Sequence, residues 1–166
     1  MSGNRTRRTD FQEPALTASG AIGKSGLEFL RDILAGRVPA PPLHATIGFQ
    51  LVDVADGVAR CELIPGEHLY GMDGTVQGGL AATLLEVVMS AAVTTVLDAA
   101  TTSTTASLSV NLTRAITGRI ANVVAEGWVV HRGRRLVTAE GRLTDAQGRL
   151  LAHASATCLL GERPSA

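Results

Sequence analysis

Apolar and polar positions follow two different periods along the chain, which predict helices in some segments and strands in others. After Ser25, apolar residues recur at helical spacing up to Leu34; Glu28 stands at capping-box spacing and Gly36 can end the helix. The run Leu80–Leu97 is apolar on almost every side and predicts one long buried helix. Six further stretches read as strands: Gly48–Val54, Val58–Ile64, Leu108–Thr113, Val123–Val130, Leu136–Leu143 and Leu150–Leu159.

Turn signals separate these elements and suggest their arrangement. The segment 55–57 (Ala-Asp-Gly) predicts a hairpin between the first two strands, and Pro39, Pro41 and Pro42 predict an extended connector before them. A helix that is apolar nearly all round has to be wrapped, and a strongly curved antiparallel sheet can enclose it. The expected class is α+β, in the hotdog arrangement: a curved antiparallel sheet around one long central helix, with an extra N-terminal helix.

The two ends carry no predicted element. Residues 1–24 are polar and irregular, without the apolar run of a signal peptide, and are expected to be a flexible tail. Residues 161–166 are expected to be a second tail, which leaves 25–160 as one domain. The run at 80–97 is long enough for a membrane span, but Glu86 near its middle and the lack of flanking Lys or Arg favour a buried helix in a soluble core.

Composition narrows the class of protein. The 15 Lys and Arg residues balance the 15 Asp and Glu residues, so net charge gives no reason to expect binding to nucleic acid or to a membrane. Cys61 and Cys158 stand far apart without a C-x-x-C motif, which argues against a disulfide framework and favours a reduced, cytoplasmic protein. The four histidines lack ligand spacing, so no metal site is expected.

Candidate chemistry begins where the loop meets the long helix. Gly78 and Gly79 at a helix start leave free backbone N–H groups at the positive end of the helix dipole, where a carbonyl oxygen gaining negative charge can bind. Close packing is the alternative reason for a glycine pair there. Glu86 is a carboxylate on an otherwise apolar helix, and its burial costs several kcal/mol unless it is paired or useful. The alternatives are a carboxylate facing solvent or paired with a cation such as Arg114.

Three segments carry a family resemblance: GTVQGGLAATLLE at 74–86, VNLTR at 110–114 and GRR at 133–135. Over about residues 26–160 the chain resembles the hotdog-fold acyl-CoA thioesterases, in particular the phenylacetate-pathway (PaaI-like) and 4-hydroxybenzoyl-CoA thioesterase group. The resemblance implies that the Gly78 N–H polarises the thioester carbonyl and that Glu86 acts as nucleophile or general base. It implies that Ser90, one turn after Glu86, supports the attacking water, and that coenzyme A enters only as part of the substrate, with no other cofactor.

The chain departs from this group at two positions in the loop. Gln77 stands where many PaaI-like members have His, and Gly71 stands where the family usually has Asn or Gln to orient the carbonyl or the water. We expect Gln77 in the catalytic set, with Gly71 and Gly79 in contact with the substrate. Arg134 and Arg135 lie in the only dense basic cluster and suit the phosphates of coenzyme A, with an ordinary solvated turn as the alternative.

The spacing of Gly78 and Glu86 predicts the assembly. They are eight residues apart, which is about 12 Å along a helix at 1.5 Å per residue, so one thioester cannot touch both in a single chain. The hypothesis is an active site shared across a homodimer interface, and the resemblance implies that dimers pair into tetramers.

Two other functions compete with acyl-CoA hydrolysis. An enoyl-CoA hydratase would need an acid and base pair, and Asp73 and His68 lack the usual spacing for one. A catalytically weak acyl-CoA-binding protein, acting as a sensor or carrier, fits the changes at Gly71 and Gln77. The sequence leaves the acyl group, the pathway and the choice between covalent and water-mediated attack open.

Overall fold

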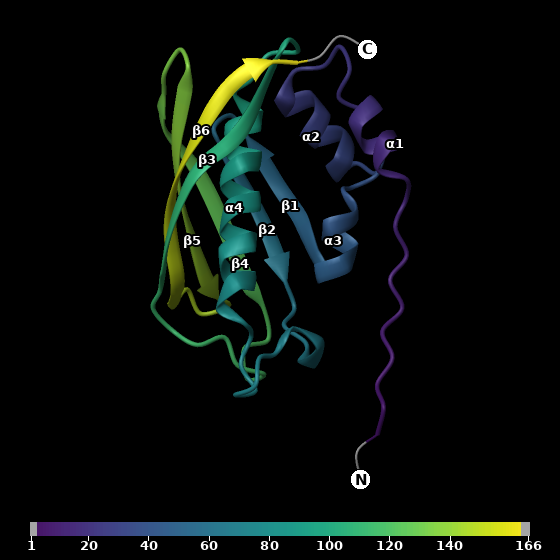
Figure 1. Cartoon of the computed structure of the whole chain (residues 1–166), viewed down its shortest axis with the longest axis vertical. Helices are drawn as coiled ribbons and strands as arrows, with labels where there is room; N and C mark the ends of the chain where they lie inside the picture. The colour runs from purple at the N-terminus through teal and green to yellow at the C-terminus, as the bar shows by residue number, and fades with distance from the viewer. Residues whose placement is uncertain (1–2, 164–166) are drawn as a thin grey trace.

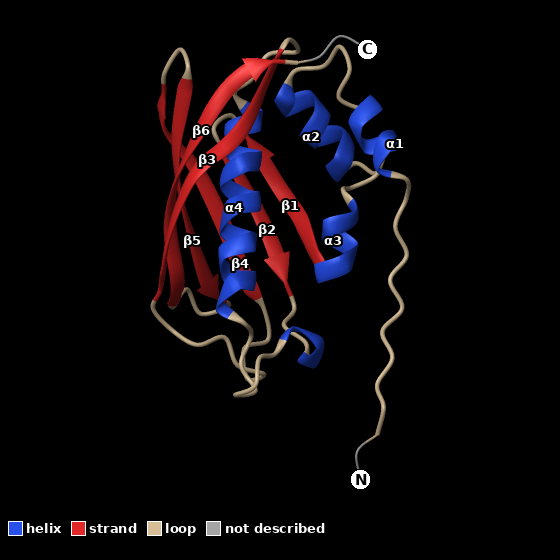
Figure 2. Ribbon diagram, viewed as in Figure 1, coloured by secondary structure: helices blue, strands red, loops and turns tan. Residues whose placement is uncertain are grey.

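One helix, α4 (Gly78–Thr95), lies against the inner face of a curved six-stranded antiparallel sheet (Figures 1 and 2). The computed structural model describes residues 3–163. The order across the sheet is β1-β2-β4-β5-β6-β3, so β1 and β3 are the edge strands. The strands are β1 (Phe49–Ala55), β2 (Val58–Leu63), β3 (Thr101–Leu112), β4 (Val123–Arg132), β5 (Leu136–Asp145) and β6 (Leu150–Glu162). The sequence-based prediction of a hotdog arrangement is confirmed.

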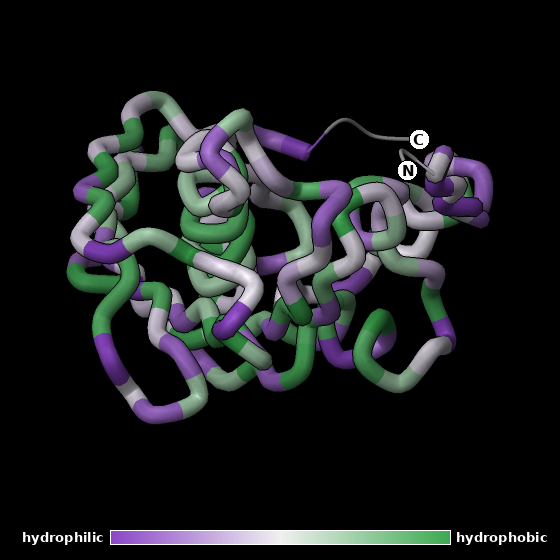
Figure 3. The backbone as a smooth tube through the Cα atoms, turned by 90° about the horizontal axis from the view of Figure 1, so that it is seen from below, coloured by the Kyte–Doolittle hydropathy of each residue, from purple (hydrophilic) through white to green (hydrophobic). Residues whose placement is uncertain are grey.

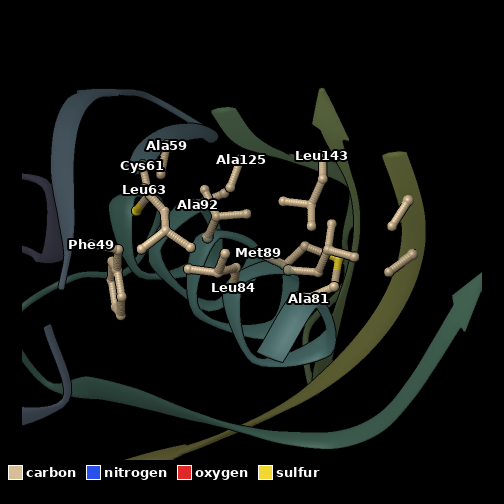
Figure 4. Close-up of a cluster of buried hydrophobic side chains, with 14 of the residues drawn as sticks. Phe49, Ala59, Cys61, Leu63, Ala81, Leu84, Met89, Ala92, Ala125 and Leu143 are labelled. Atoms are coloured by element: carbon tan, nitrogen blue, oxygen red, sulfur yellow. The ribbon is translucent and has the colours of Figure 1, made fainter. Parts of the chain in front are cut away.

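The core forms where α4 meets the strands, because α4 contacts all six of them. Seen end on in Figure 3, the apolar helix is surrounded by chain, and Figure 4 shows core side chains from the strands meeting those of the helix. Leu85, Val88 and Met89 are completely buried. The helix also approaches the sheet closely, since a Cβ placed at Gly127 of β4 would lie 2.7 Å from the Val88 carbonyl oxygen. Among the described residues, only α4 is long and apolar enough to cross a membrane, and here it is the central helix of the sheet.

Three short helices precede the sheet: α1 (Pro14–Ser19), α2 (Gly26–Leu34) and α3 (Pro42–Ile47). The predicted capping box of α2 is present, with the Glu28 N–H donating to Ser25 Oγ at 3.4 Å and the Ser25 N–H donating to the Glu28 carboxylate at 2.9 Å. Helix α2 packs on α4 and β1, and the Gly26 N–H donates to the Leu97 carbonyl at 3.0 Å. The extra N-terminal helix is therefore part of the fold.

Some boundaries differ from the sequence-based prediction. Helix α1 forms within the expected irregular segment and α3 begins in the expected extended connector, because proline at the first helical position has the right φ and lacks only an N–H that would be unpaired. Strand β3 starts at Thr101 rather than near Leu108, since its first half is a threonine-rich run without apolar alternation. Strand β6 includes the first two residues of the expected tail at 161–166, whose residues 164–166 lie outside the described part of the chain.

Candidate active site

The loop between β2 and α4 is held in place by its own backbone and by Asp73. The Gly71 N–H donates to the Thr75 carbonyl at 2.7 Å, and the Val76 N–H donates to the Ile116 carbonyl at 2.8 Å. The Asp73 carboxylate accepts hydrogen bonds from the Thr75 N–H at 3.1 Å and the Thr75 hydroxyl at 2.9 Å. These bonds hold the pKa of Asp73 below its ordinary value, so the carboxylate stays ionised. The hydrogen bonds of Asp73 therefore stabilise the turn between Asp73 and Thr75.

The start of α4 presents free amides. Gln77 is the N-cap residue, and its side chain makes no capping hydrogen bond. The Leu80 N–H donates to the Gln77 carbonyl at 2.9 Å, whereas the N–H groups of Gly78 and Gly79 have no backbone partner among the described residues. A Cβ at Gly79 would meet nothing within 4 Å, and one at Gly78 would lie 2.6 Å from the tip of the Leu112 side chain. Tight packing therefore does not account for Gly79, and at Gly78 it involves only the end of a flexible side chain. Both glycines keep the backbone open to a ligand.

The two unusual loop positions, Gly71 and Gln77, lie together. A Cβ placed at Gly71 would be only 2.6 Å from Gln77 Oε1, so the Gln77 amide occupies the space in which a side chain at position 71 would begin. Asp73 Oδ1 would lie 3.6 Å from the same Cβ, but it accepts hydrogen bonds from Thr75, and the Tyr70 hydroxyl lies against Gly118. An amide is thus present at this point of the loop, supplied from position 77.

Glu86 sits on the side of α4 that faces strand β3. Its side chain is partly buried, and the Thr105 hydroxyl donates to Glu86 Oε1 at 2.7 Å. Within the described residues Glu86 forms no ion pair, so Arg114 is not its partner. One hydrogen bond leaves most of the acceptor capacity of a carboxylate unused. Glu86 is therefore held in position and still able to accept a proton.

Thr105 contacts the Glu86 carboxylate, and the sequence does not single it out as a candidate site residue. It lies in a run of Thr and Ser residues, with nothing in the spacing to distinguish it from Thr102 or Thr104. In the sheet it pairs with Cys158 of β6, and the register shifts directly after it, between Thr105 and Ser107. Such a bulge redirects side chains and is common beside functional sites. Only the pairing of β3 with β6 places this hydroxyl on Glu86.

The remaining predicted residues fall into two groups along α4. Ser90 is partly buried one turn after Glu86 and makes no side-chain hydrogen bond to it in the described structure. Gly78 lies at the opposite end of this stretch, beside a pocket of about 270 Å³ that is also lined by Leu112 and Arg114. One chain therefore does not bring the Gly78 amide and the Glu86 carboxylate together.

The cationic candidates are also separated. Arg134 and Arg135 lie in the β4–β5 hairpin, which Figure 1 shows at the end of the sheet near the C-terminus of α4. Gly78 begins the other end of that helix. Arg114 is exposed and lines the Gly78 pocket, at the N-terminal end of α4. Of these three arginines, Arg114 is the one that shares a pocket with the first turn of α4.

Neither cysteine has the properties of a nucleophile. Burial raises the pKa of Cys61 to about 12, and burial, with the charge of Glu86 adding to it, raises the pKa of Cys158. Both thiols are free and buried in strands, as the sequence suggests. Between residues 3 and 163 no three His, Cys, Asp or Glu side chains are grouped as metal ligands.

The comparisons with known proteins point to thioesterases. Residues 73–152 match the model of the thioesterase superfamily, whereas no curated protein matches the sequence. A phenylacetic acid degradation-related protein from Ralstonia eutropha JMP134 is 25% identical, with a TM-score of 0.71 over 78% of this chain and 97% of that one. A thioesterase family protein from Silicibacter pomeroyi is 20% identical (TM-score 0.71, 89% of this chain and 99% of that one). A hypothetical thioesterase protein from Streptococcus pneumoniae TIGR4, solved with coenzyme A, is 19% identical (TM-score 0.63, 70% and 91%).

The pKa values of the two thiols lead to a direct prediction. Because each pKa is raised, both groups stay protonated at neutral pH, and burial blocks access as well. Iodoacetamide should label neither Cys61 nor Cys158 in the native protein and both after unfolding in guanidinium, as measured by mass spectrometry. Rapid labelling of native Cys158 would instead show a reachable thiolate beside Glu86.

Proposed function

Because the chain has the hotdog fold and its residues 73–152 match the model of the thioesterase superfamily, we propose that it hydrolyses an acyl-CoA thioester to a carboxylic acid and coenzyme A. The observation that carries the proposal is Glu86, a carboxylate on the central helix, oriented by Thr105 and otherwise free to act. The Streptococcus pneumoniae protein of the same fold was solved with coenzyme A, which supports this thiol as the leaving group.

The chemistry needs one proton acceptor and one site for negative charge. In the water-mediated route, Glu86 takes a proton from water while the water oxygen adds to the carbonyl carbon. The charge that develops on the carbonyl oxygen is stabilised by the Gly78 N–H at the positive end of α4. The carbon–sulfur bond then breaks and the departing thiolate receives the proton from Glu86. In the covalent route, the carboxylate attacks the carbonyl carbon and coenzyme A leaves as the thiolate. Water then cleaves the resulting anhydride, which releases the acid, restores the Glu86 carboxylate and supplies the proton for the thiolate.

Other residues around the site have supporting roles in this proposal. The Thr105 hydroxyl holds one carboxylate oxygen, which leaves the second oxygen for the water. Ser90, one helical turn further on, contacts the same water or the intermediate. The Gln77 amide over Gly71 orients the carbonyl, and open backbone at Gly79 lets the thioester approach.

The proposed active unit is a dimer, because Gly78 and Glu86 are about 12 Å apart along one helix. Strand β3 is a twelve-residue sheet edge next to Glu86, and a long unpaired edge is normally covered in a native protein. A two-fold axis near Ala82 and Thr83, midway between the two groups, would bring Gly78 of one chain to Glu86 of the partner subunit. Dimers of this kind can associate further into tetramers.

The same dimer would also place arginine side chains where the coenzyme A phosphates bind. Arg114 lines the Gly78 pocket in its own chain. Because a two-fold axis reverses the direction of α4, the β4–β5 hairpin of the partner approaches the Gly78 end, and Arg134 and Arg135 would reach the site from that chain. Guanidinium groups bind phosphate through two parallel hydrogen bonds, so either source suits the nucleotide end of the substrate.

Replacing the carboxylate tests the activity itself. Glu86→Gln keeps the size and the contact with Thr105 but cannot accept a proton, so kcat should fall by roughly 10²–10⁴-fold. The measurement is free-thiol release from aryl, short and medium acyl-CoAs, with exposed Glu140→Gln as the matched control. If the wild type binds acyl-CoA but releases no thiol, the protein is a binding protein; hydration of crotonyl-CoA would indicate a hydratase.

Subunit complementation tests the shared site. Glu86→Ala and Gly78→Val should each abolish turnover as homodimers. When the two variants are co-expressed, half of the dimers are mixed and each holds one intact site, so activity should return to about one quarter of wild type per site. Light scattering verifies the dimer. A mixture that stays inactive, or a fully active monomer, would contradict the proposal.

Substrate truncation tests the arginines. Arg114→Ala and the double variant Arg134→Ala/Arg135→Ala should each raise KM for acyl-CoA by about tenfold, since each removes charge-assisted phosphate contacts. The corresponding acyl-pantetheine, which lacks the nucleotide, should show little change. An equal effect on both substrates would mean that these side chains do not bind the nucleotide.

A further inference from the structure

We propose that Cys158 is a positioning residue whose thiol donates a hydrogen bond to Thr105 and thereby aims the Thr105 hydroxyl at Glu86. This inference rests on the proposed function of Glu86 and extends it to a residue that does not touch the substrate. The contacts form a chain across three elements, from β6 through β3 to α4. Cys158 Sγ lies 3.9 Å from Thr105 Oγ1, which lies 2.7 Å from Glu86 Oε1.

The number of protons available determines which group donates in each of these two hydrogen bonds. The Thr105 hydroxyl has one proton, and a carboxylate can only accept, so this proton points at Glu86. The lone pairs of Thr105 Oγ1 are then the acceptor for Cys158, whose thiol must be the donor. Burial and the charge of the nearby Glu86 carboxylate raise the pKa of the Cys158 thiol and outweigh the opposite effect of its contact with Thr105. The thiol is therefore protonated at neutral pH, as this arrangement requires.

The sheet fixes both side chains in place. Thr105 and Cys158 are directly paired across β3 and β6, so they share the face that looks toward α4. The bulge that follows Thr105 interrupts the regular pairing before Ser107. On the other side Cys158 pairs with Val137 of β5, and the residue is 1% exposed. The sheet therefore holds the Cys158 thiol beside the Thr105 hydroxyl.

Cys61 supplies a comparison within the same chain. It is equally buried, at 0% exposure, and also lies in a strand that faces α4. Its side chain makes no hydrogen bond among the described residues, and it packs within the hydrophobic core. Substitution of Cys61 therefore measures what loss of a buried thiol does to folding alone, whereas substitution of Cys158 also removes a donor.

The kinetic experiment compares Cys158→Ala, Cys158→Ser and Cys61→Ala in thiol release. Cys158→Ala should lower kcat by about threefold to tenfold, as expected for one lost hydrogen bond, with KM changed less than about twofold. Cys158→Ser retains a donor and should keep most of kcat. Cys61→Ala should leave kcat and KM unchanged. Equal behaviour of the two alanine variants, or a serine variant as slow as Cys158→Ala, would overturn the proposal.

A double-mutant cycle tests whether the effect passes through Thr105. Thr105→Val removes the hydroxyl and preserves the shape, so Cys158→Ala should have no further effect on kcat in that background. An undiminished effect would show that Cys158 acts by another route.

A structural readout separates this proposal from the proposed function. If the wild type and Glu86→Gln are both inactive, the thioesterase assignment fails, but the hydrogen-bond chain can still be tested in crystals. In Cys158→Ala the Thr105 side chain should leave Glu86 or occupy two rotamers, whereas in Cys61→Ala it should remain. An unchanged Thr105 in Cys158→Ala would overturn the positioning role whether or not the enzyme turns over.

Discussion

The rest of the structure depends on how α4 is covered. An 18-residue helix with hardly any polar face cannot remain in water, and one chain of this size covers it by curving six strands around it. With few aromatic residues, the core is built mainly from Leu, Val and Ala side chains, so helix and sheet must approach closely. The backbone contact at Gly127 is a direct result. The side chains of the loop, the helix and β3 take their places relative to this packing.

Glu86 lies at the margin of the sheet that curves around α4. A carboxylate in the centre of the core would cost several kcal/mol, whereas at the margin of the sheet it needs only one hydroxyl partner and access to water. Strand β3 supplies that partner and is itself one of the two edge strands of the sheet. The partly exposed side of the helix at Glu86 and the open edge of the sheet at β3 therefore lie on the same side of the molecule. In the proposed dimer, a single contact would cover both and complete the site.

The sequence allows the central helix, the six strand segments along the chain and the first hairpin to be predicted, because each has a strong local signal. It also singles out Glu86, since a lone charge in an apolar helix is conspicuous. Thr105 is different: its role arises from the pairing of strands that are far apart in sequence, and its threonine-rich surroundings hide it. The relation between Gly71 and Gln77 likewise depends on how the loop folds back. Local patterns therefore predict elements, while contacts between elements identify their functional partners.

The stretch of α4 between Gly78 and Glu86 also limits which insertions and deletions the protein can tolerate. Helical geometry links length to direction, so inserting one residue between these positions would turn Glu86 by about 100° about the helix axis and move it by about 1.5 Å. The carboxylate would then point away from Thr105, even if the helix remained fully folded. Insertions in the segment between β3 and β4 leave this angle unchanged. The first half of α4 is therefore a spacer of fixed length, and tolerated insertions and deletions should be confined to the loops.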